Sequence, residues 1–298
     1  MFKHSFSLRG KVMKIIIGKT SGFCGGVKRT VNKTEELLKN EKDIYSLGDI
    51  VHNGRVIDNL SRMGLKVVSK KEDINDYSKV IIRAHGETLD TYNEFIKRNI
   101  EIYDLTCGKV KLIHKKIAKE ASDNFVIIIG KKAHPEVIAH KSYANDVFVI
   151  ENEDDIKDAF ECFNKSSLQK VYIVCQTTFN EEKFNYLVKK MPNVFINIPI
   201  TIDNTICDAT SKRQEETRAL AKKVNAMIII GGKNSSNTEE LYIISKKYCS
   251  KTYKIETSEE LHDISFNDSD TVGIMAGAST PDEVINEVYE FIENKRYL

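Results

Sequence analysis

The sequence predicts an α/β protein made of three similar units, each with a mostly parallel sheet. Short runs of β-branched residues alternate with segments whose apolar residues recur at helical spacing, from one end of the chain to the other. Strict alternation of this kind is typical of parallel sheets, because a crossover helix joins each strand to the next. A second observation, a pattern of cysteine, glycine and polar residues that occurs three times, divides the chain into equivalent parts.

Eight apolar runs predict strands, because β-branched residues pack well on a pleated surface. In chain order they are Lys14 to Gly18, Asp43 to Leu47, Val80 to Arg83, Asn124 to Ile129, Val147 to Ile150, Val171 to Val174, Ala226 to Ile230 and Thr271 to Met275. Helices are expected between them. Helical spacing is clearest in the sets Val27, Val31, Leu37, Leu38 and Val284, Ile285, Val288, Ile292.

Composition excludes several classes of protein. The 298 residues are 41% hydrophobic and 30% charged, which is enough for folded domains and rules out a disordered chain. Lysine and arginine total 45 against 43 acidic residues, so the net charge of +2 gives no indication of nucleic-acid binding. The longest aliphatic runs are far shorter than the ~20 residues of a membrane-spanning helix. We therefore expect a cytoplasmic protein with small-molecule partners. Residues 1–13 are expected to be a short tail or a misassigned start.

The repeat begins at Cys24, Cys107 and Cys207, each at the entrance of a helical segment. A glycine that closes the following strand comes 24, 23 and 24 residues later. A polar side chain lies four residues beyond each glycine. Another polar side chain follows the next strand in each copy. These side chains are His52 and His85 in the first copy, His134 and Thr177 in the second, and Ser235 and Ser279 in the third. The units predicted in this way are residues 14–106, 107–205 and 206–298.

Three cysteines at helix starts form a plausible site for a soft metal, because the helix dipole and free N–H groups stabilise thiolates. The glycines on both sides of Cys24 let the backbone pass close to a bulky group. Three thiolates suit either a [4Fe–4S] cluster with one open iron or a catalytic zinc with a bound water, and their spacing does not separate the two. Cys162, Cys175 and Cys249 are expected to be buried apolar side chains.

The polar residues at the other turns suit a phosphate or diphosphate, since they donate hydrogen bonds beside free backbone N–H groups. The predicted set is His52, His85, His134, Ser235, Ser236, Asn237 and Ser279. Neither a phosphate-binding lysine loop nor a G-x-G-x-x-G motif follows any strand, which argues against a nucleotide. The remaining histidines are expected to be structural or solvated. They are His4, His114, His140 and His262.

Glu136 and Thr177 are the candidates for proton transfer. Glu136 follows Pro135 in the first turn of a predicted helix, where a glutamate often only stabilises the helix dipole. Inside a site it could instead supply a proton to a reacting atom within hydrogen-bond reach. Thr177 could cap a helix or relay a hydrogen bond to a substrate hydroxyl group.

Taken together, these residues resemble the 4-hydroxy-3-methylbut-2-enyl diphosphate reductases, the enzymes of the last step of the non-mevalonate isoprenoid pathway. The similar segments follow the family's order from about residue 14 to 290, and jointly they are specific. They are Gly22-Phe23-Cys24-Gly25-Gly26-Val27, Val51-His52-Asn53, Ala84-His85-Gly86, Thr106-Cys107, His134-Pro135-Glu136-Val137, Gln176-Thr177-Thr178, Cys207-Asp208-Ala209-Thr210 with Arg213-Gln214-Glu215, Lys233-Asn234-Ser235-Ser236-Asn237 and Ala276-Gly277-Ala278-Ser279.

The resemblance implies a pseudo-threefold cloverleaf around a [4Fe–4S] cluster ligated by Cys24, Cys107 and Cys207. It implies reductive dehydroxylation of a small allylic diphosphate to isopentenyl and dimethylallyl diphosphate, with Glu136 as proton donor, assisted by Thr177. Ferredoxin or flavodoxin is the implied electron donor. The sequence departs from the family at Gly108, where proline is usual, and at Cys175, where threonine is common and a second redox role stays open. A zinc hydrolase and an iron–sulfur redox sensor are the alternatives.

Overall fold

The computed structural model describes residues 13–295, which divide into two compact units. One unit contains residues 24–211, and the other combines residues 13–23 with residues 212–295. Within residues 13–295 the strands form three four-stranded sheets, and every strand pairing in them is parallel. The predicted α/β class is therefore confirmed. The predicted tail lies outside the described residues except for Met13, which is buried in a core.

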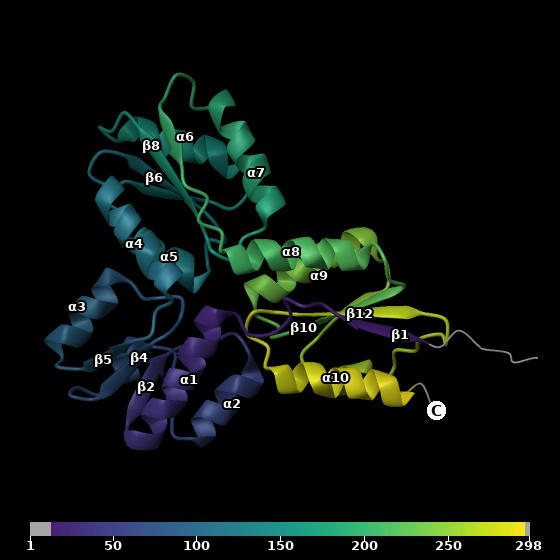
Figure 1. Cartoon of the computed structure of the whole chain (residues 1–298). Coiled ribbons are helices and arrows are strands. Elements are labelled where there is room, and N and C mark those ends of the chain that lie inside the picture. The colour runs from purple at the N-terminus through teal and green to yellow at the C-terminus, as the bar shows by residue number, and fades with distance from the viewer. Residues whose placement is uncertain (1–12, 296–298) are drawn as a thin grey trace, which may run out of the picture. The chain divides into compact units, whose positions relative to one another are not determined.

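The unit of residues 24–211 contains two sheets, visible in Figure 1. The first sheet has the order β3-β2-β4-β5. Its elements are α1 (Gly25–Asn40), β2 (Ile44–Leu47), α2 (Gly54–Arg62), β3 (Lys66–Val68), the 3-10 turn Lys71–Asp73, β4 (Lys79–Ile82), α3 (Leu89–Lys97) and β5 (Glu101–Asp104).

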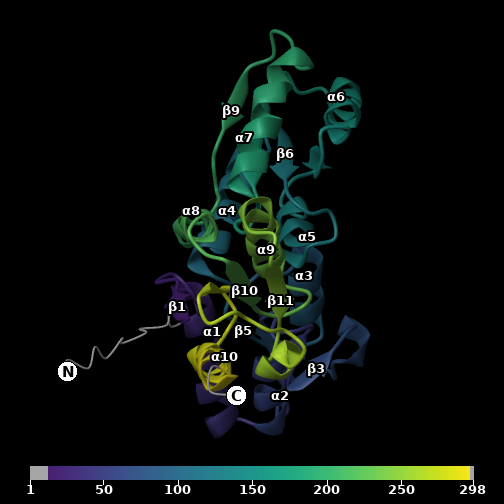
Figure 2. The same cartoon turned by 90° about the vertical axis from the view of Figure 1, so that its right-hand side faces the viewer.

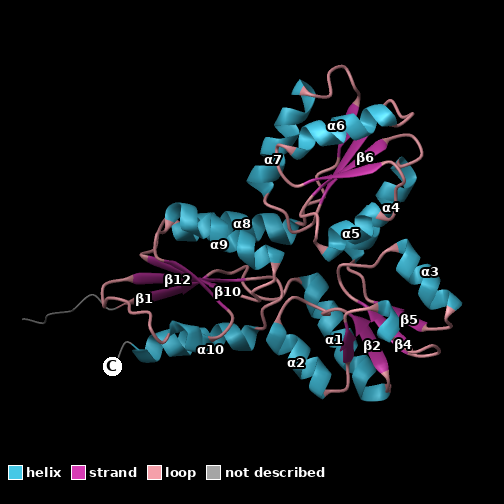
Figure 3. Cartoon of the chain, turned by 180° about the vertical axis from the view of Figure 1, so that it is seen from behind, coloured by secondary structure: helices cyan, strands magenta, loops and turns pink. Residues whose placement is uncertain are grey.

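The second sheet of this unit has the order β7-β6-β8-β9. Its elements are α4 (Gly108–Glu120), β6 (Phe125–Ile129), α5 (Pro135–Lys141), β7 (Val147–Ile150), α6 (Asp155–Lys165), β8 (Val171–Cys175), α7 (Glu181–Lys190), the 3-10 turn Met191–Asn193 and β9 (Ile200–Ile202). Helices α6 and α7 lie on one face of the sheet and α4 and α5 on the other (Figure 3). The apolar run of β6 is buried on both faces, because alternate residues enter the cores on opposite sides.

The other unit has the sheet β1-β12-β10-β11. Its elements are β1 (Lys14–Ile17), most of α8 (Asp208–Ala221), β10 (Ala226–Ile230), α9 (Ser236–Tyr248), β11 (Thr252–Ile255), the 3-10 turn Ser258–Leu261, β12 (Thr271–Ala276) and α10 (Asp282–Lys295). Helix α10 packs on one face through Val284 and Val288, and Leu220 of α8 and Leu241 of α9 pack on the other. Figure 1 shows these helices on opposite sides of the sheet.

The three sheets share one order of strands, and this order corrects the assignment of the first strand. In each sheet the fourth position is taken by the strand that directly precedes a cysteine helix: β5 before α4, β9 before α8, and β1 before α1. Residues Lys14–Ile17 pair with Thr271–Ile274, so β1 belongs to the sheet of β10, β11 and β12 and not to the first predicted unit. We keep the other predicted unit boundaries, between residues 106 and 107 and between residues 205 and 206, as a proposal.

Four strands were not predicted, namely β3, β5, β9 and β11, all of which are labelled in Figure 2. All four are edge strands of their sheets. Edge strands are partly exposed and carry polar residues, as in Glu101–Asp104 of β5, so they lack the continuous apolar run of a central strand. The longest described helix is α1, with 16 residues. No helix in the described part of the chain is long and apolar enough to cross a bilayer.

Candidate functional site

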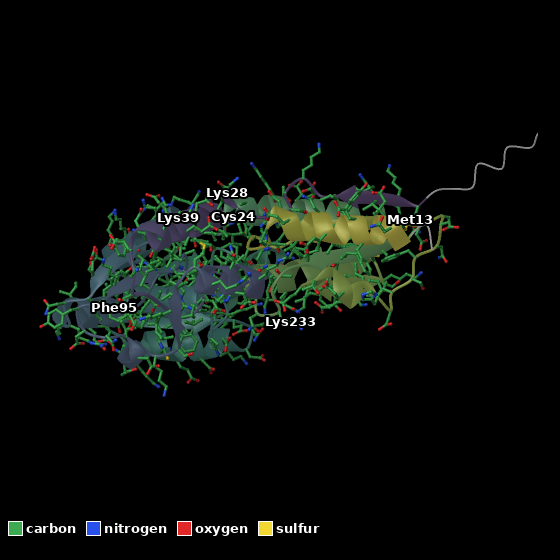
Figure 4. All side chains as sticks on the ribbon, turned by 90° about the horizontal axis from the view of Figure 1, so that it is seen from below. Met13, Cys24, Lys28, Lys39, Phe95 and Lys233 are labelled. Carbon is green, nitrogen blue, oxygen red and sulfur yellow. The ribbon has the colours of Figure 1, made fainter. Side chains whose placement is uncertain are left out.

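The three predicted cysteine ligands lie in the unit of residues 24–211, and each stands immediately before a helix. Cys24 precedes α1, Cys107 precedes α4 and Cys207 precedes α8. Figure 4 labels Cys24 close to Lys28 of α1. The sulfur of Cys24 accepts the Val27 N–H at 3.5 Å. All six cysteines lie within the described residues, and none of them forms a disulfide. The three thiols therefore stand outside any disulfide at helix starts.

Gly26 shows how closely two of these thiols approach each other. A Cβ atom at Gly26 would lie 2.8 Å from the sulfur of Cys107 and 3.9 Å from the sulfur of Cys24. Both sulfurs therefore face the same small volume, which only glycine leaves open. The first helical residues Gly25 and Gly108 also have open space where a Cβ would stand. This glycine-lined cradle with free thiols has the donor chemistry that an iron–sulfur cluster requires.

Backbone hydrogen bonds tie Cys107 and Cys207 to the turns that follow central strands. The N–H of Cys107 donates to the carbonyl of Ala84 at 3.0 Å, and that of Cys207 donates to the carbonyl of Thr177 at 3.0 Å. The ammonium group of Lys109 lies 3.4 Å from the Asp208 carboxylate, which joins the starts of α4 and α8. The cysteines thus lie next to the residues predicted to bind substrate.

Three predicted histidines gather in the same unit. The ring centroids of His52 and His85 are 4.7 Å apart, those of His85 and His134 are 5.2 Å apart, and those of His52 and His134 are 5.8 Å apart. Their ligand nitrogens lie within 4.8 Å of one another, so all three rings can contact one small group. Nδ1 of His85 is buried without a hydrogen-bond partner among the described residues. A buried polar atom without a partner is a candidate contact for a bound ligand.

The three imidazoles are held neutral. Burial lowers the pKa of each ring, and the guanidinium group of Arg83 lowers it further. The pKa of His134 falls to about 4. Nδ1 of His134 accepts the Glu136 N–H at 3.2 Å, so Nε2 carries the proton of the neutral ring. His134 is therefore a fixed hydrogen-bond donor through Nε2.

Glu136 and Thr177 form a buried pair. The Thr177 N–H donates to Oε1 of Glu136 at 2.6 Å, and the Thr177 hydroxyl donates to Oε2 at 2.7 Å. Burial alone would raise the pKa of this carboxyl group, but His140, with smaller contributions from His134 and the Thr177 N–H, lowers it to about 2. Glu136 is therefore a carboxylate at neutral pH, and Thr177 is oriented by it.

Four predicted residues belong to the other unit. Ser235 caps α9 by accepting the Thr238 N–H at 3.3 Å, and Ser236 and Asn237 form the first turn of that helix. A Cβ at Gly277 would lie 3.7 Å from Nδ2 of Asn237, so the start of α9 lies beside the turn that carries Ser279. Both polar atoms of the Asn237 amide are buried without a hydrogen-bond partner in the described residues. These side chains form a second polar turn cluster within their own unit.

Two residues near Glu136 were not predicted to have a functional role. His114 and His140 are buried, and their ring centroids lie 5.0 Å apart. Nε2 of His140 lies 3.3 Å from Oε1 of Glu136, four residues away on α5. The i, i+4 spacing of Glu136 and His140 was the available signal. Cys175, in contrast, is fully buried in an apolar core, where burial raises its thiol pKa well above its ordinary value, as expected for a packing residue.

Substituting Gly26 tests the cradle. Gly26→Ala would bring a methyl group within 2.8 Å of the Cys107 sulfur, so we expect iron bound per chain to fall by at least about half. The measurement is iron content after anaerobic reconstitution. Gly54→Ala is the matched control, because Gly54 also opens a helix and its Cβ would meet open space. Equal iron in both variants would contradict the prediction.

Acid should destabilise the protein through its buried histidines. Burial lowers the pKa of His114 to about 3 and that of His134 to about 4, from an ordinary value of 6.5. Below pH 6.5 the unfolded chain therefore binds more protons, and the free energy of unfolding falls as pH decreases. Each of the two histidines should cost about 1–2 kcal/mol between pH 7 and pH 5. Urea unfolding at these pH values measures the loss, and equal midpoints would contradict it.

A family model for the LytB protein matches residues 15–293 of this chain. Among similar curated proteins is the 4-hydroxy-3-methylbut-2-enyl diphosphate reductase of Aquifex aeolicus, 40% identical over 288 residues, which span 95% of this chain and 96% of that protein. The reductase of the same name from Petrotoga mobilis is 37% identical over 289 residues, covering 95% of this chain and 99% of the relative.

Solved structures give the same result. A structure described as (E)-4-hydroxy-3-methyl-but-2-enyl diphosphate reductase, the terminal enzyme of the non-mevalonate pathway, matches with a TM-score of 0.68 at 40% identity, covering 95% of this chain and 99% of that chain. The E-1-hydroxy-2-methyl-but-2-enyl-4-diphosphate reductase from Plasmodium falciparum matches with a TM-score of 0.85 at 27% identity, covering 95% and 88%.

Proposed function

This chain belongs to the LytB protein family, and we propose that it is a 4-hydroxy-3-methylbut-2-enyl diphosphate reductase that uses a [4Fe–4S] cluster. The reaction is the reductive dehydroxylation of the allylic diphosphate to isopentenyl and dimethylallyl diphosphate. The observation that carries the proposal is the presence, in one unit, of the cysteine cradle beside the three-histidine cluster and the Glu136–Thr177 pair.

Cys24, Cys107 and Cys207 would hold the cluster. When bound, the cluster would supply one-electron reduction and an iron site that is open to the substrate hydroxyl group. The sulfur of Cys24 accepts the Val27 N–H, and the glycines leave the space that a bulky ligand needs. The electrons are proposed to come from ferredoxin or flavodoxin.

The diphosphate would be bound by His52, His85 and His134, and by Ser235, Ser236, Asn237 and Ser279 of the other unit. Neutral imidazoles donate N–H groups, and the nearby Arg83 charge adds an attractive potential for an anion. A bound diphosphate would also favour protonation of rings whose pKa burial has lowered. Substrate binding is therefore expected to be coupled to proton uptake.

Glu136 and Thr177 would handle the proton at the hydroxyl end of the substrate. The Thr177 hydroxyl is 2.7 Å from Glu136 Oε2, so a proton that the carboxylate takes up during turnover could pass through this hydroxyl to a substrate oxygen beside it. Protonation lets the substrate hydroxyl group leave as water. The burial of both side chains excludes solvent from competing with this transfer.

Metal analysis tests the proposal. Anaerobically purified protein should be brown, contain about four irons per chain and reduce the allylic diphosphate with reduced viologen. Colourless protein with one zinc in each chain would favour the hydrolase alternative. A stable cluster without turnover would favour the redox sensor. Electron paramagnetic resonance of the reduced protein provides the cluster type independently of activity.

A further inference from the structure

Residues 19–22, which we call the entry turn, lead from β1 toward Cys24, and a carboxylate of helix α8 binds their first half. Oε1 of Glu216 accepts the Lys19 N–H at 2.7 Å, while Oε2 accepts the Thr20 N–H at 2.8 Å and the Thr20 hydroxyl at 2.6 Å. Burial by itself would raise the pKa of Glu216, but these hydrogen bonds lower it below its ordinary value. Glu216 is therefore a carboxylate that holds the entry turn through both of its oxygens.

Arg213, on the same helix, holds the second half of the entry turn. Its side chain is buried, with Nε donating to the Thr20 carbonyl at 2.6 Å and Nη2 donating to the Gly22 carbonyl at 2.7 Å. A buried guanidinium group is costly to desolvate unless its N–H groups are hydrogen-bonded. Because the group is a rigid planar fork, its two hydrogen bonds also fix the directions in which both carbonyls point. Arg213 thus sets the course of the backbone just before Cys24.

The rest of the entry turn is fixed by β12 and α10, within the same unit as Arg213 and Glu216. The Ala276 N–H of β12 donates to the Ser21 hydroxyl at 3.2 Å. Gly22 has a φ of 89°, and a Cβ atom there would lie 2.8 Å from a carboxylate oxygen of Asp282, so this position requires glycine. Each residue of the entry turn therefore has a contact with α8, β12 or α10.

We propose that Arg213 and Glu216 are positioning residues for the thiol of Cys24. Cys24 comes two residues after Gly22, so its Cα can lie at most about 7.6 Å from the Cα of Gly22. A thiol on a fixed chain is presented in one place, whereas a thiol on a loose chain must be ordered when its ligand binds, at a cost in conformational entropy. Groups that orient metal ligands change metal affinity by about 10–100-fold. The inference rests on the proposed function, which makes Cys24 a ligand of the cluster.

The first measurement is hydrogen–deuterium exchange of the full-length protein, purified anaerobically, and it needs no turnover. In Glu216→Ala and in Arg213→Ala, the amides of residues 19–27 should exchange at least about fivefold faster than in wild type, because the contacts that hold the entry turn are lost. The buried amides of β10, in the same unit, should keep their wild-type rates. Glu215→Ala is the matched control, since Glu215 is exposed on the same helix.

Two exchange results would overturn the positioning role. One is faster exchange confined to residues 19 and 20, with residues 23–27 unchanged, because the effect would then stop short of Cys24. The other is an equal acceleration in β10, which would mean a general loss of stability.

The second measurement is the rate at which reconstituted holoprotein releases iron to a chelator. Glu216→Ala and Arg213→Ala should each release iron at least about tenfold faster than wild type, while Glu215→Ala should match wild type. Wild-type release rates in both variants would overturn the link to the cluster. If the wild-type protein assembles no iron–sulfur cluster, the proposed function fails, and the exchange result still decides whether Arg213 and Glu216 position the Cys24 thiol.

Discussion

Replacing any one of the three cysteines by serine should abolish cluster assembly and turnover. In the proposed site, Cys24→Ser, Cys107→Ser and Cys207→Ser each remove one of the three protein ligands, so no spare ligand remains. Even groups outside the ligand set change metal affinity by about 10–100-fold. Loss of a ligand should therefore lower both the retained iron and kcat/KM by more than about 100-fold. Iron analysis and visible absorbance after anaerobic reconstitution measure the retained iron. Viologen oxidation measures kcat/KM.

Cys162→Ser is the matched control for this experiment. Cys162 is partly buried on α6, where it packs beside an apolar core. The control variant should retain its iron and its turnover. If Cys107→Ser kept a full complement of iron and wild-type activity, the cradle around Gly26 would not be the cluster site.

Glu136→Gln should leave substrate binding largely intact and remove turnover. Glutamine keeps the shape of the side chain and an oxygen that can accept the Thr177 N–H, but it has no acidic proton to give. Loss of general acid catalysis corresponds to about 10²–10⁴ in kcat. KM should change by less than about threefold, because the diphosphate contacts remain. Steady-state kinetics with reduced viologen separates the two parameters.

The exposed Glu161 on α6 provides a control with the same chemical change. Glu161→Gln should have wild-type kcat and KM. Turnover of Glu136→Gln at the wild-type rate would remove Glu136 from the proton path. A large rise in KM with kcat unchanged would instead assign it to binding.

The central strands and the class of fold could be predicted because burial on both faces demands uninterrupted apolar runs. The run Ile127-Ile128-Ile129 in β6 and the run Ile228-Ile229-Ile230 in β10 are fully buried and were identified. Four of the six edge strands in the described sheets were not predicted, because partial exposure permits polar residues such as Lys254 in β11. The sheet to which β1 belongs was not predicted, for a different reason. Its partner β12 lies at the far end of the chain, and local sequence does not encode that pairing.

The part of the candidate site that could be predicted from the sequence consists of the residues that recur in each copy of the repeat. The cysteines and turn residues recur at fixed offsets, so their types and positions indicated one site. The environment of Glu136 could not be predicted in the same way, because His114 and His140 lie on different helices and meet only after tertiary packing. Gly86 illustrates the same limit. Its positive φ of 77° and the 2.7 Å from its Cβ position to the His114 ring depend on the folded arrangement of both segments.

The pairing of β1 with β12 has a consequence for synthesis on the ribosome. Residues Lys14–Ile17 emerge first, yet their hydrogen-bond partners Thr271–Ile274 are among the last to be translated. Until then β1 has no sheet to join, and the segment that leads from it to Cys24 has no fixed end. Completion of the polypeptide therefore supplies the partner strand that anchors the segment leading to Cys24.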